Sequence, residues 1–277
     1  MKTWKYLFGV LALVALSLWL ALLASPDKNL RLIACDVGQG DAILAISGKF
    51  QILTDGGPDN SVLTCLEKYL PFWDREIELV ILTHPQLDHY RGLIEVFNRY
   101  KVDTFLTNDF SPSTQGLKAL ENAVGGGGAR VVRPAVGTRL RLGMIYLDIL
   151  HPAKGIISKE PNDISIVTVL RFGEFEALLT GDIGPKIIEK LLTENLIEPV
   201  DYIKIPHHGS RNGTTLELLE KSMPKLAVIS VGKGNSYGHP HQEVLKMLES
   251  YGLRIFRTDK DGDVEVVTDG KKWWVSD

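Results

Sequence analysis

The sequence predicts an α/β protein in which a mixed β-sheet is covered by helices and preceded by an apolar N-terminal helix. Short runs of β-branched and other apolar residues alternate along the chain with stretches of helical periodicity. Several neighbouring runs are separated only by short turns, so hairpins are expected beside parallel pairs. The 277 residues are 44% hydrophobic and 23% charged, which excludes a disordered or fibrous chain.

Strands are expected where apolar runs end in turn residues, and helices where apolar residues recur every three or four positions. The expected strands are residues 30–36, 42–45, 50–54, 79–83, 104–106, 144–150, 165–171, 176–180, 202–205, 226–231, 254–257 and 264–268, with one more near 131–132. The expected helices are residues 61–70, 90–99, 114–123, 185–195, 215–221 and 242–251.

The chain is expected to contain an N-terminal segment, residues 1–26, and one domain, residues 27–277. No period repeats along the sequence, and no linker is long enough to divide the second part. The single low-complexity segment is the four glycines at 125–128, which predict a flexible loop between a helix and a strand.

The N-terminal segment predicts a membrane anchor. Residues 6–24 are 19 uncharged residues behind Lys2 and Lys5. About 20 such residues form a helix of roughly 30 Å, enough to cross the hydrocarbon core. A cleaved signal peptide is the alternative, but Leu22 and Leu23 stand where small residues are needed before a cleavage site. We therefore expect a single-pass protein of the cell membrane with its bulk outside the cytoplasm, because the two lysines stay inside.

The chain has two cysteines, Cys35 and Cys65. An exported domain could pair them, since such compartments are oxidising. Two cysteines make no disulfide framework, however, and Cys65 is expected on a helix. We therefore expect both to remain unpaired.

The charge of the main domain argues against a dedicated nucleic-acid binder. Residues 27–277 hold 29 basic and 34 acidic residues, a net charge of −5. Nucleic-acid binders usually show a basic excess. Contact with DNA would therefore depend on a local basic patch and a bound metal. Cations close to the motifs described next could hold phosphates, and these are Arg91, Lys204, Arg211 and Lys233.

Polar and ionisable residues gather in six short motifs, five of which follow an expected strand. The motifs are DVGQGD at 36–41, DGG at 55–57, HPQLDH at 84–89, TGD at 180–182, PHHGS at 206–210 and YGHPH at 237–241. Because strand ends meet at the edge of a sheet, we expect one shared site there.

The run from His84 to His89 predicts a metal site. It places His84, Asp88 and His89 at i, i+4 and i+5 after a strand, and imidazole and carboxylate ligands suit zinc and manganese. Six of the seven histidines lie in the motifs, and the exception is His151. A single histidine is more often solvated or satisfied in a core, but six grouped in this way favour metal binding.

The ordered set of motifs resembles the metallo-β-lactamase-fold domain that is attached to bacterial competence DNA-uptake channel proteins. The resemblance covers most of residues 30–268. It implies a four-layer αββα sandwich, two divalent ions (Zn or Mn) at the sheet edges and hydrolytic activity. The channel's membrane helices are not found here, so we expect a free-standing relative on one anchor.

The resemblance also implies roles for individual residues. His84 binds the first metal, Asp88 and His89 bind the second, and Asp182 bridges the two. One or both of His207 and His208 adds a ligand, and His239 or His241 completes the set; among these we favour His207 and His239. Asp55 braces the metal loop through hydrogen bonds, as outer residues of metal sites do. Asp41, Asn162 and His241 are expected in the same supporting layer.

Gln86 departs from the pattern of the family. The general pattern has His at this position and the competence relatives usually have Asp, whereas a Gln amide oxygen is an uncharged and poor zinc ligand. The departure leaves open a site with one metal, or a weak one.

The sequence leaves three functions open. With two ions about 3.5–4 Å apart, a bridging hydroxide forms near neutral pH and attacks phosphorus or carbonyl carbon. We favour a phosphodiesterase or nuclease acting on DNA, with Asp88, His208 and Asp36 as catalytic residues, His208 protonating the leaving group. Turn formation at Gly38 and Gly40 is an equal alternative for Asp36. The rival functions are hydrolysis of another ester or amide, such as phosphocholine, and non-catalytic binding. Expected partners are DNA, the membrane and, as a candidate, a separate uptake channel.

Overall fold

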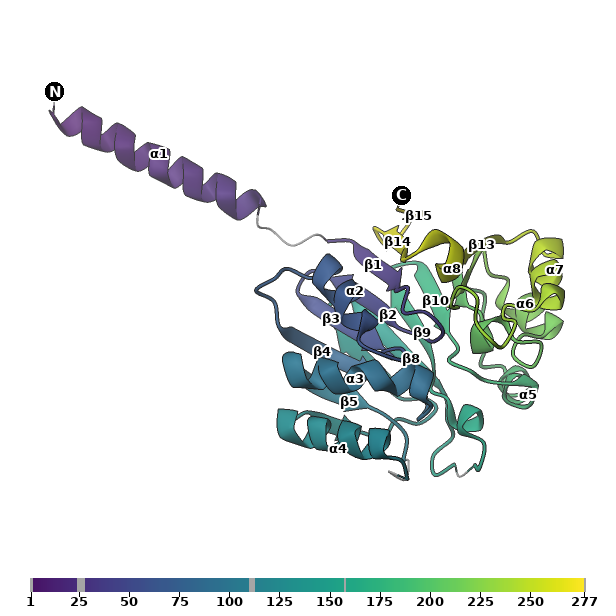
Figure 1. Cartoon of the computed structure of the whole chain (residues 1–277). Coiled ribbons are helices and arrows are strands. Elements are labelled where there is room, and N and C mark those ends of the chain that lie inside the picture. Colours follow the sequence, from purple (N-terminus) through teal and green to yellow (C-terminus); the bar gives the residue numbers. More distant parts are fainter. Residues whose placement is uncertain (1, 24–27, 110–112, 157, 277) are drawn as a thin grey trace.

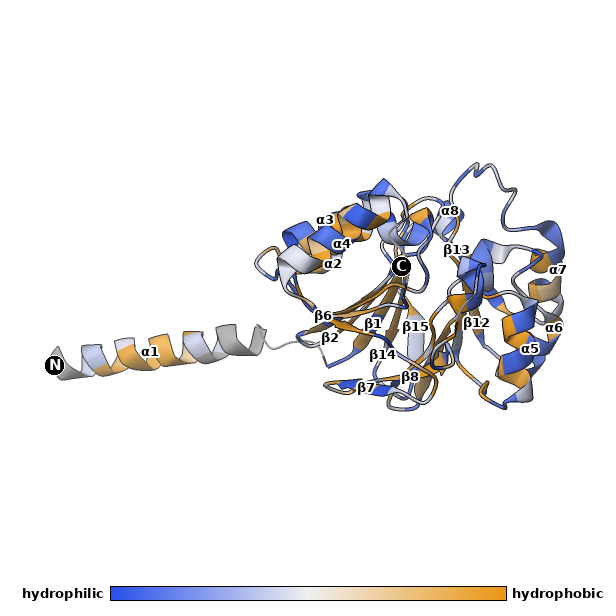
Figure 2. Cartoon of the chain, turned by 90° about the horizontal axis from the view of Figure 1, so that it is seen from below, coloured by the Kyte–Doolittle hydropathy of each residue, from blue (hydrophilic) through white to orange (hydrophobic). Residues whose placement is uncertain are grey.

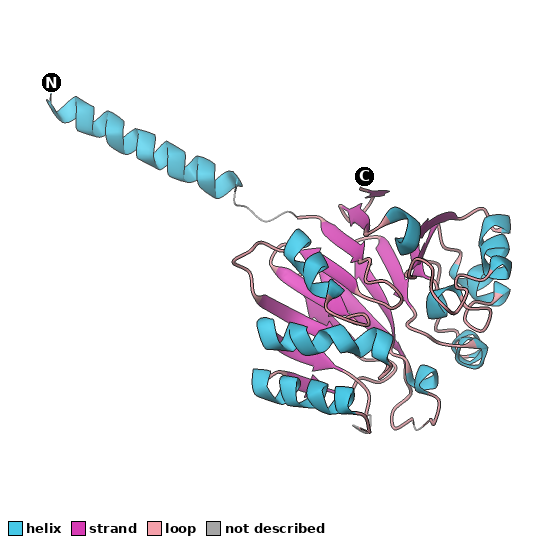
Figure 3. Cartoon of the chain, viewed as in Figure 1, coloured by secondary structure: helices cyan, strands magenta, loops and turns pink. Residues whose placement is uncertain are grey.

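Two β-sheets flanked by helices form the main part of the chain (Figures 1 and 3). The computed structural model describes residues 2–23, 28–109, 113–156 and 158–276. Its strands are β1 (Leu30–Ala34), β2 (Ile43–Ser47), β3 (Phe50–Thr54), β4 (Glu76–Ile81), β5 (Lys101–Leu106), β6 (Arg130–Val132), β7 (Arg139–Leu142), β8 (Ile145–His151), β9 (Val167–Phe172), β10 (Phe175–Leu179), β11 (Tyr202–Lys204), β12 (Leu226–Ile229), β13 (Arg254–Arg257), β14 (Val264–Thr268) and β15 (Trp273–Val275). Its helices are α1 (Lys2–Leu23), α2 (Ser61–Tyr69), α3 (Leu87–Arg99), α4 (Gln115–Gly127), α5 (Pro185–Thr193), α6 (Leu216–Ser222), α7 (Gln242–Ser250) and α8 (Thr258–Asp261), with short 3-10 turns at Pro161–Ile164 and Pro206–Gly209.

Each sheet is antiparallel in one half and parallel in the other. The first has the order β15-β14-β1-β2-β3-β4-β5-β6, with parallel pairing from β3 to β6. The second has the order β13-β12-β11-β10-β9-β8-β7, with parallel pairing from β10 to β13. Because parallel strands end at the same edge, the loops after β4, β10 and β11 can meet there.

The sheets pack face to face and helices cover their outer faces. In β1, Leu30, Leu32 and Ala34 face the layer between the sheets. Ile33 of β1 and Cys35, the first residue after it, face α2–α4. A third apolar cluster packs α5, α6 and α7 on the other side. In Figure 2 the apolar strands lie between these two groups of helices. The predicted αββα sandwich is confirmed, and strands such as β2 and β12 are apolar on both faces because both of their faces are covered.

Helix α4 is longer than the sequence indicated. It continues through Gly125, Gly126 and Gly127, where we expected a flexible loop, so that expectation is wrong. Val124 is buried in the cluster beneath α2–α4, and its packing holds the last turn although glycine disfavours a helix. The helix ends at Gly128, whose φ of 69° is the left-handed conformation that glycine adopts readily.

Two edge strands were not anticipated. β7 pairs with β8, and β15 pairs with β14. Both are three or four residues long, and the alternation of charged and apolar residues in Arg139–Leu142 produces no continuous apolar run. Trp273, Trp274 and Val275 favour a strand but are too few to predict one alone, and pairing with a neighbouring strand decides the conformation of both segments.

Residues Lys2–Leu23 form helix α1. Among the residues that the structure describes, no helix combines the length and the apolarity that crossing a membrane requires. The expected anchor at residues 1–26 stays a prediction. The alternative cleavage position near residues 24 and 25 lies outside the described residues.

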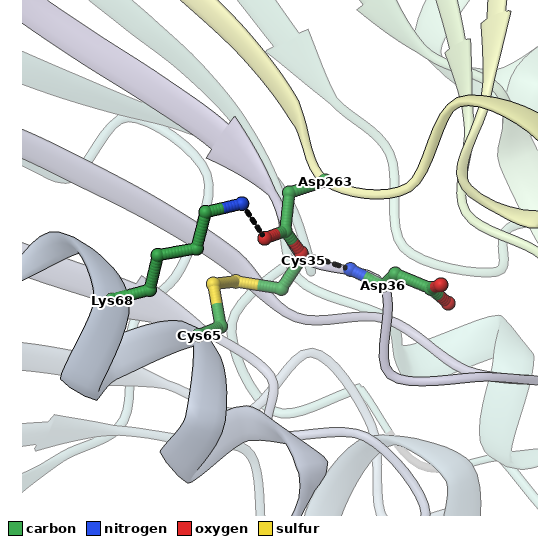
Figure 4. The surroundings of a disulfide bond; sticks show 5 residues. All are labelled: Cys35, Asp36, Cys65, Lys68 and Asp263. Carbon is green, nitrogen blue, oxygen red and sulfur yellow. Dashed lines mark hydrogen bonds and ion pairs between the residues drawn. A yellow bond between two sulfur atoms is a disulfide. The ribbon is translucent and has the colours of Figure 1, made fainter.

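The two cysteines form a disulfide, contrary to our expectation (Figure 4). Helix α2 packs on the outer face of the first sheet, which brings Cys65 to a Cα–Cα distance of 5.9 Å from Cys35 at the end of β1. Beside the disulfide, Asp263 accepts hydrogen bonds from the Lys68 ammonium and the Asp36 backbone N–H, both at 2.8 Å. The disulfide therefore fixes the start of the loop that leads from Cys35 to Asp41.

Replacing both Cys35 and Cys65 by Ala is expected to lower the free energy of unfolding by about 3 kcal/mol, because the crosslink spans 30 residues of the unfolded chain. Urea unfolding followed by circular dichroism measures the change. A reducing agent should weaken the wild type by a similar amount and leave the double variant unaffected. Equal urea midpoints for the wild type and the double variant would show that the bond contributes no stability.

Candidate metal centre

Four side chains from three separate segments of the chain meet at one edge of the sandwich. They are Asp88, His89, Asp182 and His208, and one ligand atom from each lies within 4.8 Å of the others. Asp88 and His89 lie in the first turn of α3, after β4. Asp182 follows β10, and His208 lies in the 3-10 turn after β11. The parallel halves of both sheets thus place these four residues at a shared edge.

Asp182 lies at the centre of this cluster. Its Oδ2 is 3.3 Å from Nε2 of His89 and 3.3 Å from Nε2 of His208. Asp88 Oδ2 lies 3.4 Å from the same His208 atom, and its side chain keeps 27% of its surface exposed. Solvent or a substrate can therefore approach the cluster past Asp88, while the other three side chains are buried.

The imidazole rings are oriented as metal ligands are. Nε2 of His84, His89 and His208 is buried and has no hydrogen-bond partner within the described residues. The opposite nitrogens are held: Nδ1 of His89 lies 2.8 Å from Asp55 Oδ2, and Nδ1 of His208 lies 2.9 Å from the Ser230 carbonyl oxygen. Such contacts set the tautomer that leaves Nε2 free to bind a metal. The donor set of two imidazoles and two carboxylates fits zinc or manganese.

Asp55 supports the metal loop from beneath. It is completely buried and accepts hydrogen bonds from the Thr83 backbone N–H at 2.8 Å and the Thr83 hydroxyl at 2.7 Å, in addition to its contact with His89. Burial raises the pKa of Asp55, an effect that His89 opposes. Gly92 allows α3 to approach this loop, because a Cβ there would lie 2.0 Å from the Gly56 carbonyl oxygen.

A buried lysine joins the supporting layer. Lys204 is 0% exposed, forms an ion pair with Asp41, and lies 3.4 Å from Asp182 Oδ1. It cannot hold a substrate phosphate, as we had considered from the sequence. Burial alone raises the pKa of Asp41, but Lys204 and His208 together hold it well below the usual range. Burial lowers the pKa of Lys204, yet Asp41 and Asp182 raise it above its ordinary value.

Of the neighbouring pair His207 and His208, the structure places His208 among Asp88, His89 and Asp182. Both residues have a left-handed backbone, with φ of 51° and 54°, so their rings point in different directions at an interplanar angle of 77°. The His207 ring instead lies 5.8 Å from that of His239. Strained backbone of this kind occurs often at functional sites. The geometry thus favours His208 over His207 as a ligand.

The remaining histidines line the rim of the cluster. His239 is partly buried beside the His208 ring, with the ring centroids 6.4 Å apart. Burial, followed by the nearby His208 and His207, lowers the pKa of His239 to about 4. His241 accepts a hydrogen bond from the Arg211 backbone N–H at 3.2 Å. Neither residue belongs to the four-residue cluster, although both lie close to it.

Two further residues expected at the site have other surroundings. Asp36 is exposed, and its Oδ1 accepts the Gly38 N–H at 3.2 Å, which is the turn role that we weighed against catalysis. Asn162 lies in the Pro161–Ile164 turn, where its side-chain oxygen is buried without a hydrogen-bond partner in the described residues.

The ligands for a second ion are fewer. His84 packs against His89, with ring centroids 4.1 Å apart, and its free Nε2 is buried, but the position two residues later is Gln86. Burial lowers the pKa of His84 to about 3. A second cluster of possible ligands consists of Asp41, Asp55 and His89, but Asp41 already forms an ion pair with the Lys204 ammonium. The described residues therefore provide one four-ligand set, and a second ion stays a prediction.

Sequence reasoning missed three supports of the site. The burial of Lys204 had a weak signal, since it lies within the expected strand 202–205, two residues before the PHHGS motif begins. The Thr83 hydroxyl had none, and the Ser230 carbonyl had none either, because a backbone oxygen is independent of residue type. All three contacts depend on which segments the fold brings together.

His151, the histidine outside the motifs, gives a pH test of the core. It is buried, neither ring nitrogen has a hydrogen-bond partner in the described residues, and burial lowers its pKa to about 4 from 6.5. Its neutral form therefore stabilises the fold above pH 6.5. As the pH falls from 6.5 to 4, the unfolded chain takes up a proton that the folded chain excludes, which costs about 1.4 kcal/mol per pH unit.

We therefore expect the advantage in unfolding free energy of the wild type over His151→Gln to shrink as the pH falls from 7 to 5. Urea titrations at several pH values measure this difference. A difference that stays constant with pH would show that His151 titrates normally in the folded protein.

Comparison with known proteins agrees with this geometry. The family model described as "Metallo-beta-lactamase superfamily" matches residues 35–233. ComE operon protein 3 of Bacillus subtilis is 28% identical over 250 residues, which are 83% of this chain and 32% of that protein. Recombination protein 2 of Haemophilus influenzae is 28% identical over 263 residues, 94% of this chain and 31% of the relative. The chain thus spans about a third of the length of these relatives.

A solved structure shares the fold. The metallo-beta-lactamase fold protein YhfI of Bacillus subtilis superposes with a TM-score of 0.57 at 11% identity, covering 89% of this chain and all of that one. At this identity the likeness concerns the fold alone. Taken with the family match over residues 35–233 and the cluster of histidines and aspartates, these relationships show that the chain belongs to the metallo-beta-lactamase superfamily, carries a His/Asp metal site and is related to the competence proteins.

Proposed function

We propose that the chain is a metal-dependent hydrolase that cleaves phosphodiester bonds, with DNA outside the cytoplasm as its substrate. The observation that carries the proposal is the cluster of Asp88, His89, Asp182 and His208, in which the free imidazole nitrogens converge on one buried point. The relationship to competence proteins supports DNA as the substrate.

Asp88, His89, Asp182 and His208 would hold the metal. A divalent ion held by them would supply the means to deprotonate water near neutral pH. The surrounding residues fix the ligands: Asp55 orients His89, and Lys204 holds Asp182 from the side away from His208. Such preorganised contacts need no rearrangement during the reaction.

A proton must reach the leaving group as the bond breaks. With His208 in the ligand cluster, His207 becomes the member of the pair that can transfer this proton. Its ring lies at the rim, 5.8 Å from that of His239. Asp88, as the most exposed ligand, stands where substrate enters.

The test incubates the full chain with manganese or zinc and two substrates, labelled single-stranded DNA and bis(4-nitrophenyl) phosphate. We expect both to be cleaved, with activity lost on chelation and restored by the metal. Binding to DNA should be weak and sensitive to salt, since a domain of net charge −5 contacts few phosphates. Cleavage of a phosphocholine ester or an amide, with neither phosphodiester cleaved, would replace the proposal by the rival hydrolase.

Non-catalytic binding is the second candidate, and Gln86 favours it because a family ligand is missing there. A fully metal-loaded protein that cleaves none of these substrates would establish it. A Gln86→Asp variant gives a sharper comparison, because it restores the carboxylate usual in the competence relatives. If the wild type is inactive and Gln86→Asp is active, the glutamine at position 86 is the reason that the wild type does not hydrolyse these substrates.

We further propose that the domain is extracytoplasmic and held at the cell membrane by residues 1–26, where it could act beside a separate uptake channel. The Cys35–Cys65 disulfide supports an oxidising compartment. Protease added to intact spheroplasts should digest the domain, and the chain should remain in the membrane fraction. A processed protein in the medium would contradict the anchor, and protection from protease would contradict the orientation.

A further inference from the structure

A pocket of about 630 Å³ opens beside the metal loop, between helices α3 and α4. Pro85 and Leu87 form its side toward the metal centre, and these residues flank Gln86 in the loop that carries His84 and Asp88. The first turn of α4 forms the opposite side. A substrate bound at the cluster could therefore extend directly into this pocket.

The pocket contains a cation without a partner. Arg91 lines it, is exposed, and makes no hydrogen bond or ion pair with the described residues. It lies three residues after Asp88 on α3, so the two side chains are neighbours on one helix face, with Cβ atoms about 5–6 Å apart. The planar guanidinium is suited to bind phosphate oxygens in pairs.

The adjacent Tyr90 supplies a second unpartnered group. Tyr90 is 5% exposed, and its hydroxyl makes no hydrogen bond among the described residues. The ring packs against α4 at Gly116, where a Cβ would lie 2.3 Å from the hydroxyl oxygen. Because both Tyr90 and Gly116 line the pocket, a ligand in it is positioned to accept the hydroxyl proton. The ring is buried, but the hydroxyl oxygen itself reaches the solvent of the pocket, so it is free to donate to an anion bound there.

Backbone donors complete the pocket. Thr114 caps α4 by accepting the Leu117 N–H with its side chain. The N–H groups of Gln115 and Gly116, in the same turn, have no partner inside the helix. Donors at a helix N-terminus favour anions, and here they lie on the wall opposite Arg91.

We propose that this pocket binds the phosphate next to the scissile one in a nucleotide chain, through Arg91 and the Tyr90 hydroxyl. The inference rests on the proposed phosphodiesterase function and specifies its substrate as a chain with at least two adjacent phosphates. Specificity for a polymer then arises from α3, the helix that also presents Asp88 to the metal.

The first test needs no catalysis. Phenylglyoxal labels exposed arginines of the full chain, and peptide mass spectrometry follows each site. Inorganic phosphate is expected to slow the labelling of Arg91 several-fold. The labelling rate of Arg99 should hardly change. Arg99 is a matched control, because it is exposed on the same helix and eight residues away, about 12 Å along its axis. Protection should persist with a chelator and weaken in Tyr90→Phe.

The second test compares substrates. Arg91→Ala is expected to raise the KM for an oligothymidylate about tenfold relative to that for bis(4-nitrophenyl) phosphate, which has one phosphate. Arg91→Lys should recover part of this ratio. Arg99→Ala removes the same charge elsewhere and should leave the ratio unchanged.

The outcomes separate the two proposals. A wild type that cleaves neither substrate defeats the proposed function, while phosphate protection still decides whether the pocket binds an anion. Cleavage of both substrates with equal KM ratios in Arg91→Ala and Arg99→Ala overturns the subsite. Equal protection of both arginines, or protection of Arg91 that disappears with the chelator, overturns it as well, since the phosphate would then lie elsewhere.

Discussion

Replacement of Asp182 by Ala is expected to remove bound metal from the protein and to abolish phosphodiester cleavage. Asp182 Oδ2 lies within 3.3 Å of Nε2 of both His89 and His208, so its loss breaks the cluster at its centre. Loss of a residue that only supports a ligand typically costs about 10- to 100-fold in metal affinity, and loss of a central ligand should exceed that range.

Metal content of the purified protein, measured by mass spectrometry, provides the readout. Gln86→Ala is the control, because it changes a neighbouring residue that lies outside the four-residue cluster, and it should retain metal. Circular dichroism verifies that both variants are folded. Full metal content in Asp182→Ala would sink the assignment of the cluster as the metal site.

Lys204→Met is expected to lower the free energy of unfolding of the metal-free protein by about 3–5 kcal/mol. The variant keeps a side chain of similar volume but leaves the buried Asp41 carboxylate without its cation, and Asp182 loses a partner as well. Urea unfolding in the presence of a chelator measures the loss. An uncompensated buried charge is costly because the protein interior solvates it poorly.

Two comparisons test this explanation. Lys186→Met breaks an ion pair with Asp163 in which the lysine is 77% exposed, and should cost less than about 1 kcal/mol. The double variant Lys204→Met/Asp41→Asn should lose less unfolding free energy than the two single variants lose together. In the double variant the side chain at position 41 carries no charge, so no buried carboxylate is left unpaired there. Additive losses would show that Lys204 acts through packing alone.

Much of the fold follows from local pattern. The strands at Phe50–Thr54 and Val264–Thr268 have the bounds that their apolar runs predict, because a largely buried run can be recognised in the sequence. The bounds of Arg254–Arg257 are also as predicted, although this strand is only partly buried. Prediction from the sequence was wrong where contacts with other segments determine the conformation. The edge strands β7 and β15 form by pairing with β8 and β14, and Gly125–Gly127 stays helical through the packing of Val124.

The sequence by itself determined that a metal-ligand motif exists and which segments belong to it. The spacing of His84, Asp88 and His89 after a strand is a local property, and so are the turns that contain Asp182 and His208. The chemistry of these residue types is independent of the fold, and strand ends meet at sheet edges in any α/β protein.

Only the tertiary structure decided which of these residues meet. The left-handed backbone at His207 and His208 turns one ring into the cluster and the other to the rim. The packing of α2 on the first sheet joins Cys35 to Cys65, and the contact between the sheets buries Lys204 beside Asp41. Ring direction, disulfide pairing and burial of a charge depend on contacts between residues far apart in the chain, and local sequence carries no record of those contacts.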